Sequence, residues 1–210
     1  VASSAITLLD IRNNIFSNTV SGGAASSAHV GLYFPLTAAA ANGYRINNNA
    51  YYTGSTAGLS GVAFAGASLY NVANLYTAAN FNAFSSGPAV NFRSWSSVGT
   101  DNNDVHSFAS TAAAPFVSAT DLHIVAGATQ LESGGVTTTV TQDIDNAARA
   151  GFPDIGADEF AGTISDLTPP LITYPSLAGT CGSGAQVLIA NIKDPSGVPT
   201  SGAGLPVLYW

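Results

Sequence analysis

Two segments near the start of the chain repeat one pattern, and this repeat constrains the fold more than any other feature. Residues 11–19 (IRNNIFSNT) and 46–54 (INNNAYYTG) align without gaps at a separation of 35. Each segment has an apolar strand residue, then an asparagine cluster, then an apolar or aromatic pair. Repeats of this kind bury their apolar faces against their neighbours. The pattern therefore predicts strands that stack as successive coils, with the asparagines at a shared turn.

The asparagines of this turn, Asn13, Asn14, Asn48 and Asn49, are expected to be structural. Asparagine tolerates left-handed backbone angles, and its amide can pair with an asparagine stacked above it. We therefore expect the two turns to lie on one edge of the fold. A row of amides that binds a ligand is the alternative interpretation.

The composition favours strands over helices. Only 8% of the residues are charged, whereas ordinary domains have about 25%. Long surface helices usually take Glu, Lys and Arg for their outer faces, so the predicted fold class is all-β. One short helix is expected over residues 67–78 from the spacing of apolar residues. Further strands are expected over residues 122–125 and 135–141, where β-branched residues are dense.

The chain divides into two parts. Residues 161–170 contain glycine and two prolines without a strong period, which predicts a linker between residues 1–160 and residues 171–210. Three strand candidates follow the linker, over residues 171–177, 185–194 and 205–210. A β-sandwich takes about 100 residues, so we expect the second part to be the incomplete start of such a domain.

The charge pattern argues against two classes of partner. The net charge is −7, and the few basic residues are scattered along the chain. The sequence therefore contains no cluster of basic residues that could bind the phosphates of a nucleic acid. The longest apolar run, residues 30–41, contains Pro35 and is shorter than the roughly 20 residues that span a bilayer. We therefore expect neither nucleic-acid binding nor membrane insertion. Cys181 is the single cysteine and is predicted to be a small buried side chain or to pair with a cysteine outside this sequence.

Four motifs in the second half resemble the end of a known family. They are FRSWSSVGTD at residues 92–101, PFVSATDLH at 115–123, DIDNAAR at 143–149 and PDIGADEF at 153–160. In this order they are similar to the last coils of right-handed parallel β-helix proteins of the pectate-lyase-like superfamily with a choice-of-anchor type ending, which are common in surface proteins of Bacteroidota. The family commonly has glycine at the position of Asn146, and asparagine accepts the same left-handed turn.

The resemblance implies a fold and a location. The C-terminal coils of a right-handed parallel β-helix would occupy residues 1–160. Residues 171–210, with IKDPSGV at 192–198, are similar to the immunoglobulin-like modules that often follow and would begin a partial immunoglobulin-like β-sandwich. The resemblance further implies export to the cell surface by the type IX secretion system, whose machinery would then be one partner.

Acidic residues gather around Arg149, and they are Asp143, Asp145, Asp154, Asp158 and Glu159. The Asp-x-Asp-Asn start resembles a calcium loop because closely spaced oxygens suit this hard cation, yet the later glycine and distal glutamate of an EF-hand are missing. We expect Arg149 to brace the last coil through hydrogen-bonded carboxylates. This interpretation needs no cofactor, and calcium is the alternative.

No catalytic motif stands out from the sequence. His29, His106 and His123 lack metal-ligand spacing and are expected to be turn or surface residues. Polysaccharide lyases and glycoside hydrolases share the β-helix, but the motifs of their paired carboxylates or bases are not recognisable here. The tyrosines at positions 33, 44, 51, 52, 70 and 76 either form a platform for sugars or pack the coils, and we favour packing.

The predicted function is therefore non-catalytic. We expect an extracellular structural or adhesion module whose rigid β-helix presents loops to a cell-surface glycan or protein. One alternative is a fragment of a carbohydrate-active enzyme whose catalytic coils lie outside this chain. The other is a subunit of an extracellular assembly, because an uncapped coil has open strand edges.

Overall fold

The computed structural model describes ten stretches of the chain. They are residues 9–24, 27–34, 44–65, 75–82, 104–149, 151–166, 170–175, 187–194, 197–201 and 205–207. Within them the secondary structure is predominantly β, with one short helix. This confirms the all-β prediction. The motif at residues 92–101 and the residues Trp95 and Cys181 lie outside the described residues.

The two repeated segments pair in parallel. Strand β1 (Leu9–Arg12) pairs with β4 (Tyr44–Asn47), and β2 (Ile15–Asn18) pairs with β5 (Ala50–Thr53). Each residue pairs with its counterpart in the repeat, so the gapless alignment predicted the register of both ladders correctly.

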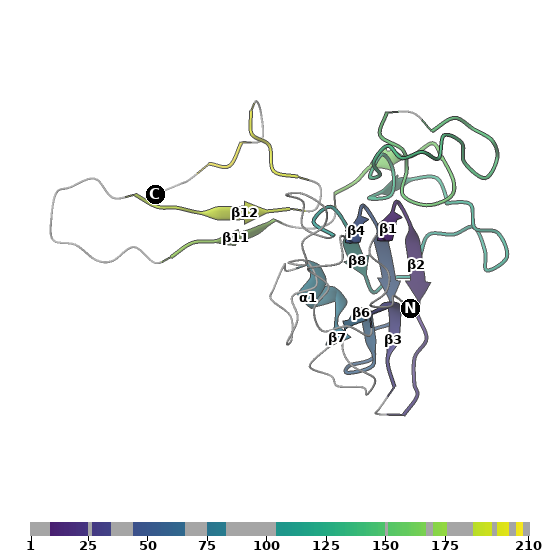
Figure 1. Ribbon diagram of the computed structural model, residues 1–210, viewed down its shortest axis with the longest axis horizontal. Helices are drawn as coiled ribbons and strands as arrows, with labels where there is room; N and C mark the ends of the chain where they lie inside the picture. Colours follow the sequence, from purple (N-terminus) through teal and green to yellow (C-terminus); the bar gives the residue numbers. More distant parts are fainter. Residues whose placement is uncertain are drawn as a thin grey trace, which may run out of the picture.

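Three further pairings form a separate sheet and extend the β2-β5 ladder. The strand β3 (His29–Phe34) pairs in parallel with β6 (Ser60–Ala65), and β6 also pairs antiparallel with β7 (Leu75–Tyr76), so these strands form a sheet of their own. The strand β8 (Phe108–Ser110) adds to the far side of β5 in parallel, which gives the order β2-β5-β8. In Figure 1 these strands lie together in one half of the molecule, beside the short helix.

The expected helix over residues 67–78 is wrong at Leu75 and Tyr76, and of its described residues only the last, Ala78, is helical. Residues 67–74 lie outside the described residues, and Leu75 and Tyr76 form β7 rather than a helical turn. Both side chains are buried, so pairing with β6 decides their conformation over the local apolar spacing. The helix α1 (Ala78–Asn82) begins afterwards, where the Thr77 hydroxyl accepts the backbone N–H of Asn80 at 3.2 Å.

The strand β5 is buried on both faces. Tyr51 is completely buried in one hydrophobic cluster, where its ring stacks on Phe16 at 5.3 Å and meets the edge of Phe81 at 5.2 Å. The next residue, Tyr52, points to the opposite face because strand side chains alternate. There it packs edge-on against Phe108, with ring centroids 6.1 Å apart. Burial therefore favours packing for these tyrosines, as predicted.

The second face of this sheet is covered by a loop layer, which we define as residues 114–149 and 151–160. Its buried side chains Ile124, Leu131 and Ile155 form the second cluster together with the residues on the outer face of β5 and β8. A full burial of each such aliphatic side chain contributes about 1.5–3 kcal/mol, so this contact is a substantial part of the core.

Strands expected inside the loop layer are not formed. Residues 122–125 contribute only an isolated antiparallel bridge between Ile124 and Phe116, and residues 135–141 contain no strand. The reason is that the backbone N–H groups bind other partners: the Gly135 N–H donates to the Pro153 carbonyl oxygen at 2.8 Å rather than to a neighbouring strand. The one strand pair that includes this layer joins β9 (Ala128–Thr129) in parallel with β10 (Thr163–Ile164), so part of the expected linker is paired.

The C-terminal part forms a small separate sheet. The strand β11 (Leu171–Thr173) pairs antiparallel with β12 (Asn191–Lys193), and both project away from the other strands in Figure 1. These strands are shorter than the expected 171–177 and 185–194, and residues 205–207, the described part of the third candidate, form no strand. Among the described residues no helix is long and apolar enough to cross a bilayer.

Candidate functional site

The asparagine turns stack on each other between the β1-β4 sheet and the β2-β5-β8 sheet, as the repeat predicted. Asn13 and Asn48 both have left-handed backbone angles, with φ of 59° and 54°. Between the two turns, the side-chain oxygen of Asn49 accepts the backbone N–H of Asn14 at 2.9 Å and its side-chain N–H at 3.2 Å. Asn49 is completely buried, so these bonds stabilise an amide that has no contact with water.

The same turns attach the loop layer. The side-chain amide of Asn13 donates to the carbonyl oxygen of Val136 at 2.6 Å and accepts its N–H at 2.9 Å. The amide of Asn48 donates to the carbonyl oxygen of Gly134 at 3.0 Å. The asparagines therefore have a second structural role that the sequence does not suggest, because their partners lie far along the chain.

Asp143 organises the first acidic turn of the loop layer. Its carboxylate accepts backbone N–H groups from Ala147 at 2.7 Å, Asp145 at 2.8 Å and Glu159 at 3.0 Å. The donor from Glu159 is the main cause of a lowered pKa at Asp143, because it favours the charged form. The turn passes through Asn146, whose φ of 66° confirms that asparagine takes the left-handed conformation here.

Asp154 and Asp158 accept donors from other parts of the layer. Asp154 accepts the backbone N–H of Ser133 at 2.6 Å and of Phe160 at 2.9 Å, while its burial raises its pKa. Asp158 accepts the backbone N–H of Ile124 at 2.8 Å. Both carboxylates therefore hold segments together that are distant in sequence.

Arg149 lies between these carboxylates, and its side chain is only 7% exposed. Its guanidinium donates to the carbonyl oxygens of Asp154 at 3.2 Å and Gly156 at 2.7 Å, and it forms an ion pair with Glu159 at 3.2 Å. Burial is the main cause of a raised pKa at Glu159, and the positive charge of Arg149 acts in the opposite direction. The expected contact between Arg149 and the acidic cluster is present, although two of its three partners are backbone carbonyls.

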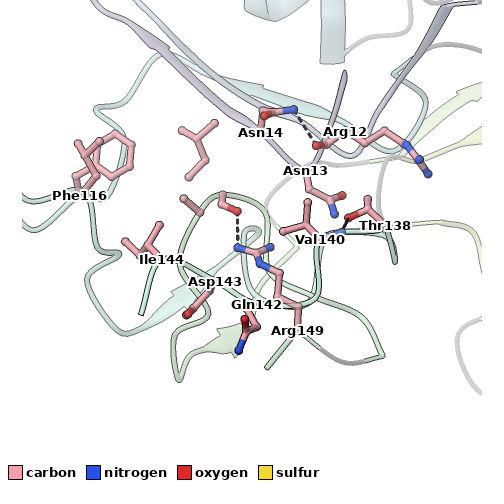
Figure 2. A pocket seen from close by; sticks show the side chains of 14 residues that line it. Arg12, Asn13, Asn14, Phe116, Thr138, Val140, Gln142, Asp143, Ile144 and Arg149 are labelled. Atoms are coloured by element: carbon pink, nitrogen blue, oxygen red, sulfur yellow. Dashed lines mark hydrogen bonds between the residues drawn. The ribbon is translucent and has the colours of Figure 1, made fainter. Parts of the chain in front are cut away.

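A groove of about 460 Å³ opens between the loop layer and the asparagine turn. In Figure 2, Phe116 and Ile144 lie at one end of the groove, and Arg12 and Thr138 lie at the other. Its lining combines amides and hydroxyls with apolar side chains. The remaining lining residues are Asn13, Asn14, Ile15, Leu122, Val140, Gln142, Asp143, Arg149, Gly156 and Ala157.

A histidine cluster lies on the exposed side of the loop layer. The Nδ1 atom of His123 lies 2.6 Å from Asp121, and its Nε2 atom lies 3.0 Å from Asp145. The bond to Asp121 and then that to Asp145 raise the pKa of His123, and the bond to His123 lowers the pKa of Asp121. Asp158 completes the cluster: one ligand atom from each of His123, Asp145 and Asp158 lies within 4.8 Å of the others.

Sequence spacing did not identify this cluster. His123 is far from Asp145 and Asp158 along the chain. The three residues therefore do not have the short sequence spacing of a known metal-binding motif. The only local signals are two short Asp-x-His and Asp-x-Asp patterns, at residues 121–123 and 143–145, which are common at exposed turns.

Comparisons with known protein families, with curated proteins and with solved structures found no match to this chain.

Proposed function

We propose that this chain is an extracellular structural and adhesion module whose loop layer binds a glycan. In this proposal residues 1–160 are coils of a right-handed parallel β-helix that provides a rigid support. The observation that carries the proposal is the parallel pairing of the two repeated segments in one common register.

The order of the strands supports a β-helix. The chain passes through β1, β2 and β3 and then through β4, β5 and β6, and these pair one to one as β1 with β4, β2 with β5, and β3 with β6. This order, in which the chain returns to the same three sheets in sequence, is the one expected of a chain that winds around a common axis. The addition of β8 in parallel to β5 supports a further coil.

The acidic residues support a structural role rather than catalysis. Glycoside hydrolysis uses a pair of carboxyl groups that flank the sugar, about 5–10 Å apart. Asp143 and Asp154 instead each accept backbone N–H groups, and Glu159 pairs with Arg149. These bonds fix the turns of the loop layer. This favours the adhesion module over the alternative of a carbohydrate-active enzyme for the described residues.

The chemistry of the groove supports a glycan as the partner. A sugar offers hydroxyl groups beside apolar C–H surfaces, and the groove offers amides and hydroxyls beside exposed apolar side chains such as Ile144, which is 50% exposed. Gln142 is exposed at the rim of the groove, and its amide can both donate and accept. Neutral oligosaccharides fit this lining better than phosphorylated ligands, because Arg12 is already paired with Asp10 at 2.6 Å.

The C-terminal sheet supports a second module. Large apolar side chains are exposed in β11 and in the segment before β12, including Ile172 at 51%, Val187 at 77% and Ile189 at 74%. Such a surface is covered in a complete domain, so we propose that residues 171–210 begin an immunoglobulin-like β-sandwich. Export to the cell surface, with the type IX machinery as a transient partner, belongs to the same proposal.

The test is glycan binding by the 210-residue chain on an oligosaccharide array, followed by affinity measurement for the best ligand. Gln142→Ala and Ile144→Ser should each weaken binding by about tenfold or more, since each removes a contact worth about 1.4 kcal/mol. Val125→Ser is the matched control, because Val125 is 54% exposed but lies outside the groove. Equal affinities for all four chains, or no glycan bound at all, would contradict the proposal.

A further inference from the structure

We propose that His123, Asp145 and Asp158 form a binding site for a divalent metal ion of the zinc class. This inference goes beyond the proposed function, because the site lies in the loop layer but does not depend on any glycan. It rests on the arrangement of three side chains that come from three separate segments of the layer.

The ligand atoms are close enough for one ion. One imidazole nitrogen of His123 and one carboxylate oxygen each from Asp145 and Asp158 lie within 4.8 Å of one another. Zinc binds imidazole nitrogen at about 2.0–2.1 Å and carboxylate oxygen at about 2.0–2.2 Å, so small movements of the side chains are enough for the three atoms to share one ion. The side chains of His123 and Asp145 are 41% and 64% exposed, which leaves them room for this movement.

Asp158 is the ligand whose position is fixed by the surrounding structure. It is only 6% exposed, and its Oδ2 atom accepts the backbone N–H of Ile124 at 2.8 Å. A carboxylate held in this way can bind an ion through an oxygen without losing its anchor. The exposed partners His123 and Asp145 would then close on it.

A second observation concerns the other nitrogen of the imidazole. The Nδ1 atom of His123 lies 2.6 Å from the carboxylate of Asp121, and this contact orients the ring so that Nε2 is directed toward Asp145. Histidines that bind metals usually donate their second N–H to a carboxylate in this manner. Asp121 is therefore a positioning residue for the site.

The ligand set selects the kind of ion. Calcium and magnesium prefer sites made wholly of oxygen, whereas an imidazole together with carboxylates suits zinc and its neighbours among the divalent transition metals. Three protein ligands leave a fourth position for water. The bound ion would cross-link the segments around residues 121–124, 143–147 and 153–160 and would add rigidity to the loop layer.

The experiment uses the 210-residue chain after removal of metals with a chelator. Zinc and calcium are titrated separately by calorimetry, and cobalt is titrated by visible absorption, which reports a tetrahedral site. We expect a single zinc ion to bind, a cobalt spectrum of tetrahedral type, and weak or undetectable calcium binding.

The variants identify the ligands. His123→Gln and Asp145→Asn should each weaken zinc binding by at least about tenfold, and Asp121→Asn by about 10–100-fold. His106→Gln is the matched control, because it removes an exposed histidine outside the cluster and should leave the affinity unchanged. Circular dichroism establishes that the variants are folded.

Three results would overturn the proposal. One is the absence of zinc binding at micromolar concentrations, and another is zinc binding that His123→Gln leaves unchanged. The third is calcium binding that is as tight as zinc binding. Glycan affinity is measured in the same samples with and without zinc, so a failure of the metal site is distinguished from a failure of the proposed glycan groove.

Discussion

Asn13 and Val136 pair like two backbone segments, although one partner is a side chain. The amide of Asn13 donates to the carbonyl oxygen of Val136 at 2.6 Å and accepts its N–H at 2.9 Å. The Asn13 carbonyl oxygen also accepts the N–H of Gly156 at 3.0 Å. One residue in the first turn of the repeat therefore joins the sheet to two distant segments of the loop layer.

Replacing Asn13 should destabilise the chain by two separable mechanisms. Asn13→Ala loses the paired hydrogen bonds, each worth about 0.5–1.5 kcal/mol, and replaces a residue that tolerates left-handed backbone angles with one that adopts them at a cost of up to about 1–2 kcal/mol. Asn13→Gly loses the same bonds without the backbone cost. The free energy of unfolding, measured by urea titration, should therefore be highest for the unchanged chain, lower for Asn13→Gly and lowest for Asn13→Ala. A glycine variant as stable as the unchanged chain, or less stable than the alanine variant, would contradict this order.

Arg149→Ala should loosen the last turns of the loop layer. The change leaves Glu159 without its cation and removes the donors to the carbonyl oxygens of Asp154 and Gly156. Removing one partner of a buried ion pair costs about 3–5 kcal/mol, which should be visible by calorimetry. Hydrogen exchange should increase within residues 151–160.

Arg45→Ala is the control for this prediction. Its guanidinium is 47% exposed and lies 4.0 Å from Asp10, so the expected change in stability is below about 1 kcal/mol. Added calcium should shift the melting temperature of the unchanged chain little. A large rise with calcium would favour the calcium-loop interpretation of residues 143–146 over bracing by Arg149.

Alkaline pH should destabilise the fold through Tyr52. Burial raises the pKa of this phenol from 10.0 to about 12. Because the folded state keeps the proton more strongly, its stabilising contribution is complete below pH 10 and is lost as pH rises toward 12. The total loss is about 3 kcal/mol for a shift of this size.

Tyr52→Phe should remove this part of the pH dependence while changing stability little at pH 7. Urea titrations at several values between pH 8 and pH 12 would measure it. Tyr174→Phe, at a tyrosine that is 63% exposed, is the control. If Tyr52→Phe and the unchanged chain lose stability in parallel above pH 10, another group controls the alkaline unfolding.

The sequence predicted the part of the fold that repeats. When a strand pairs with its counterpart in the next repeat, the sequence alignment of the repeats gives the register. The match between residues 11–19 and 46–54 was therefore sufficient to predict how β1 pairs with β4 and how β2 pairs with β5. The same logic placed Asn14 against Asn49. The two repeated regions supply both strands of each of these pairings and both partners of the Asn14–Asn49 contact, so the repeat alone was enough for these results.

The loop layer could not be predicted in the same way. Residues 135–141 alternate as a strand does, but a strand also needs a neighbouring backbone, and here the N–H of Val136 reaches the side chain of Asn13 instead. The cluster of His123, Asp145 and Asp158 depends on where three separate turns meet. Those turns are positioned by bonds between carboxylates and backbone N–H groups, which leave no periodic signal in a single sequence.

A buried polar network behind β5 gives the last prediction. Asp104 is completely buried, has a left-handed φ of 54°, and accepts hydrogen bonds from the hydroxyl of Tyr51 at 3.0 Å and from that of Ser107 at 2.5 Å. The side-chain amide of Asn49 also donates to it at 3.4 Å. The network therefore joins the asparagine turn to the residues that precede β8.

Tyr51 and Asp104 should be energetically coupled. In a double-mutant cycle of Tyr51→Phe and Asp104→Asn, we expect a coupling free energy of about 0.5–3 kcal/mol, because Tyr51→Phe removes the donor, and Asp104→Asn removes the charge and one of the two oxygens that accept from it. A parallel cycle of Tyr52→Phe with Asp104→Asn is the control. Tyr52 belongs to the other hydrophobic cluster, on the opposite face of β5, so its coupling to Asp104 should stay within about 0.5 kcal/mol of zero. Both cycles are measured by urea unfolding, and equal coupling in the two would mean that the Tyr51–Asp104 contact is not a specific part of the core.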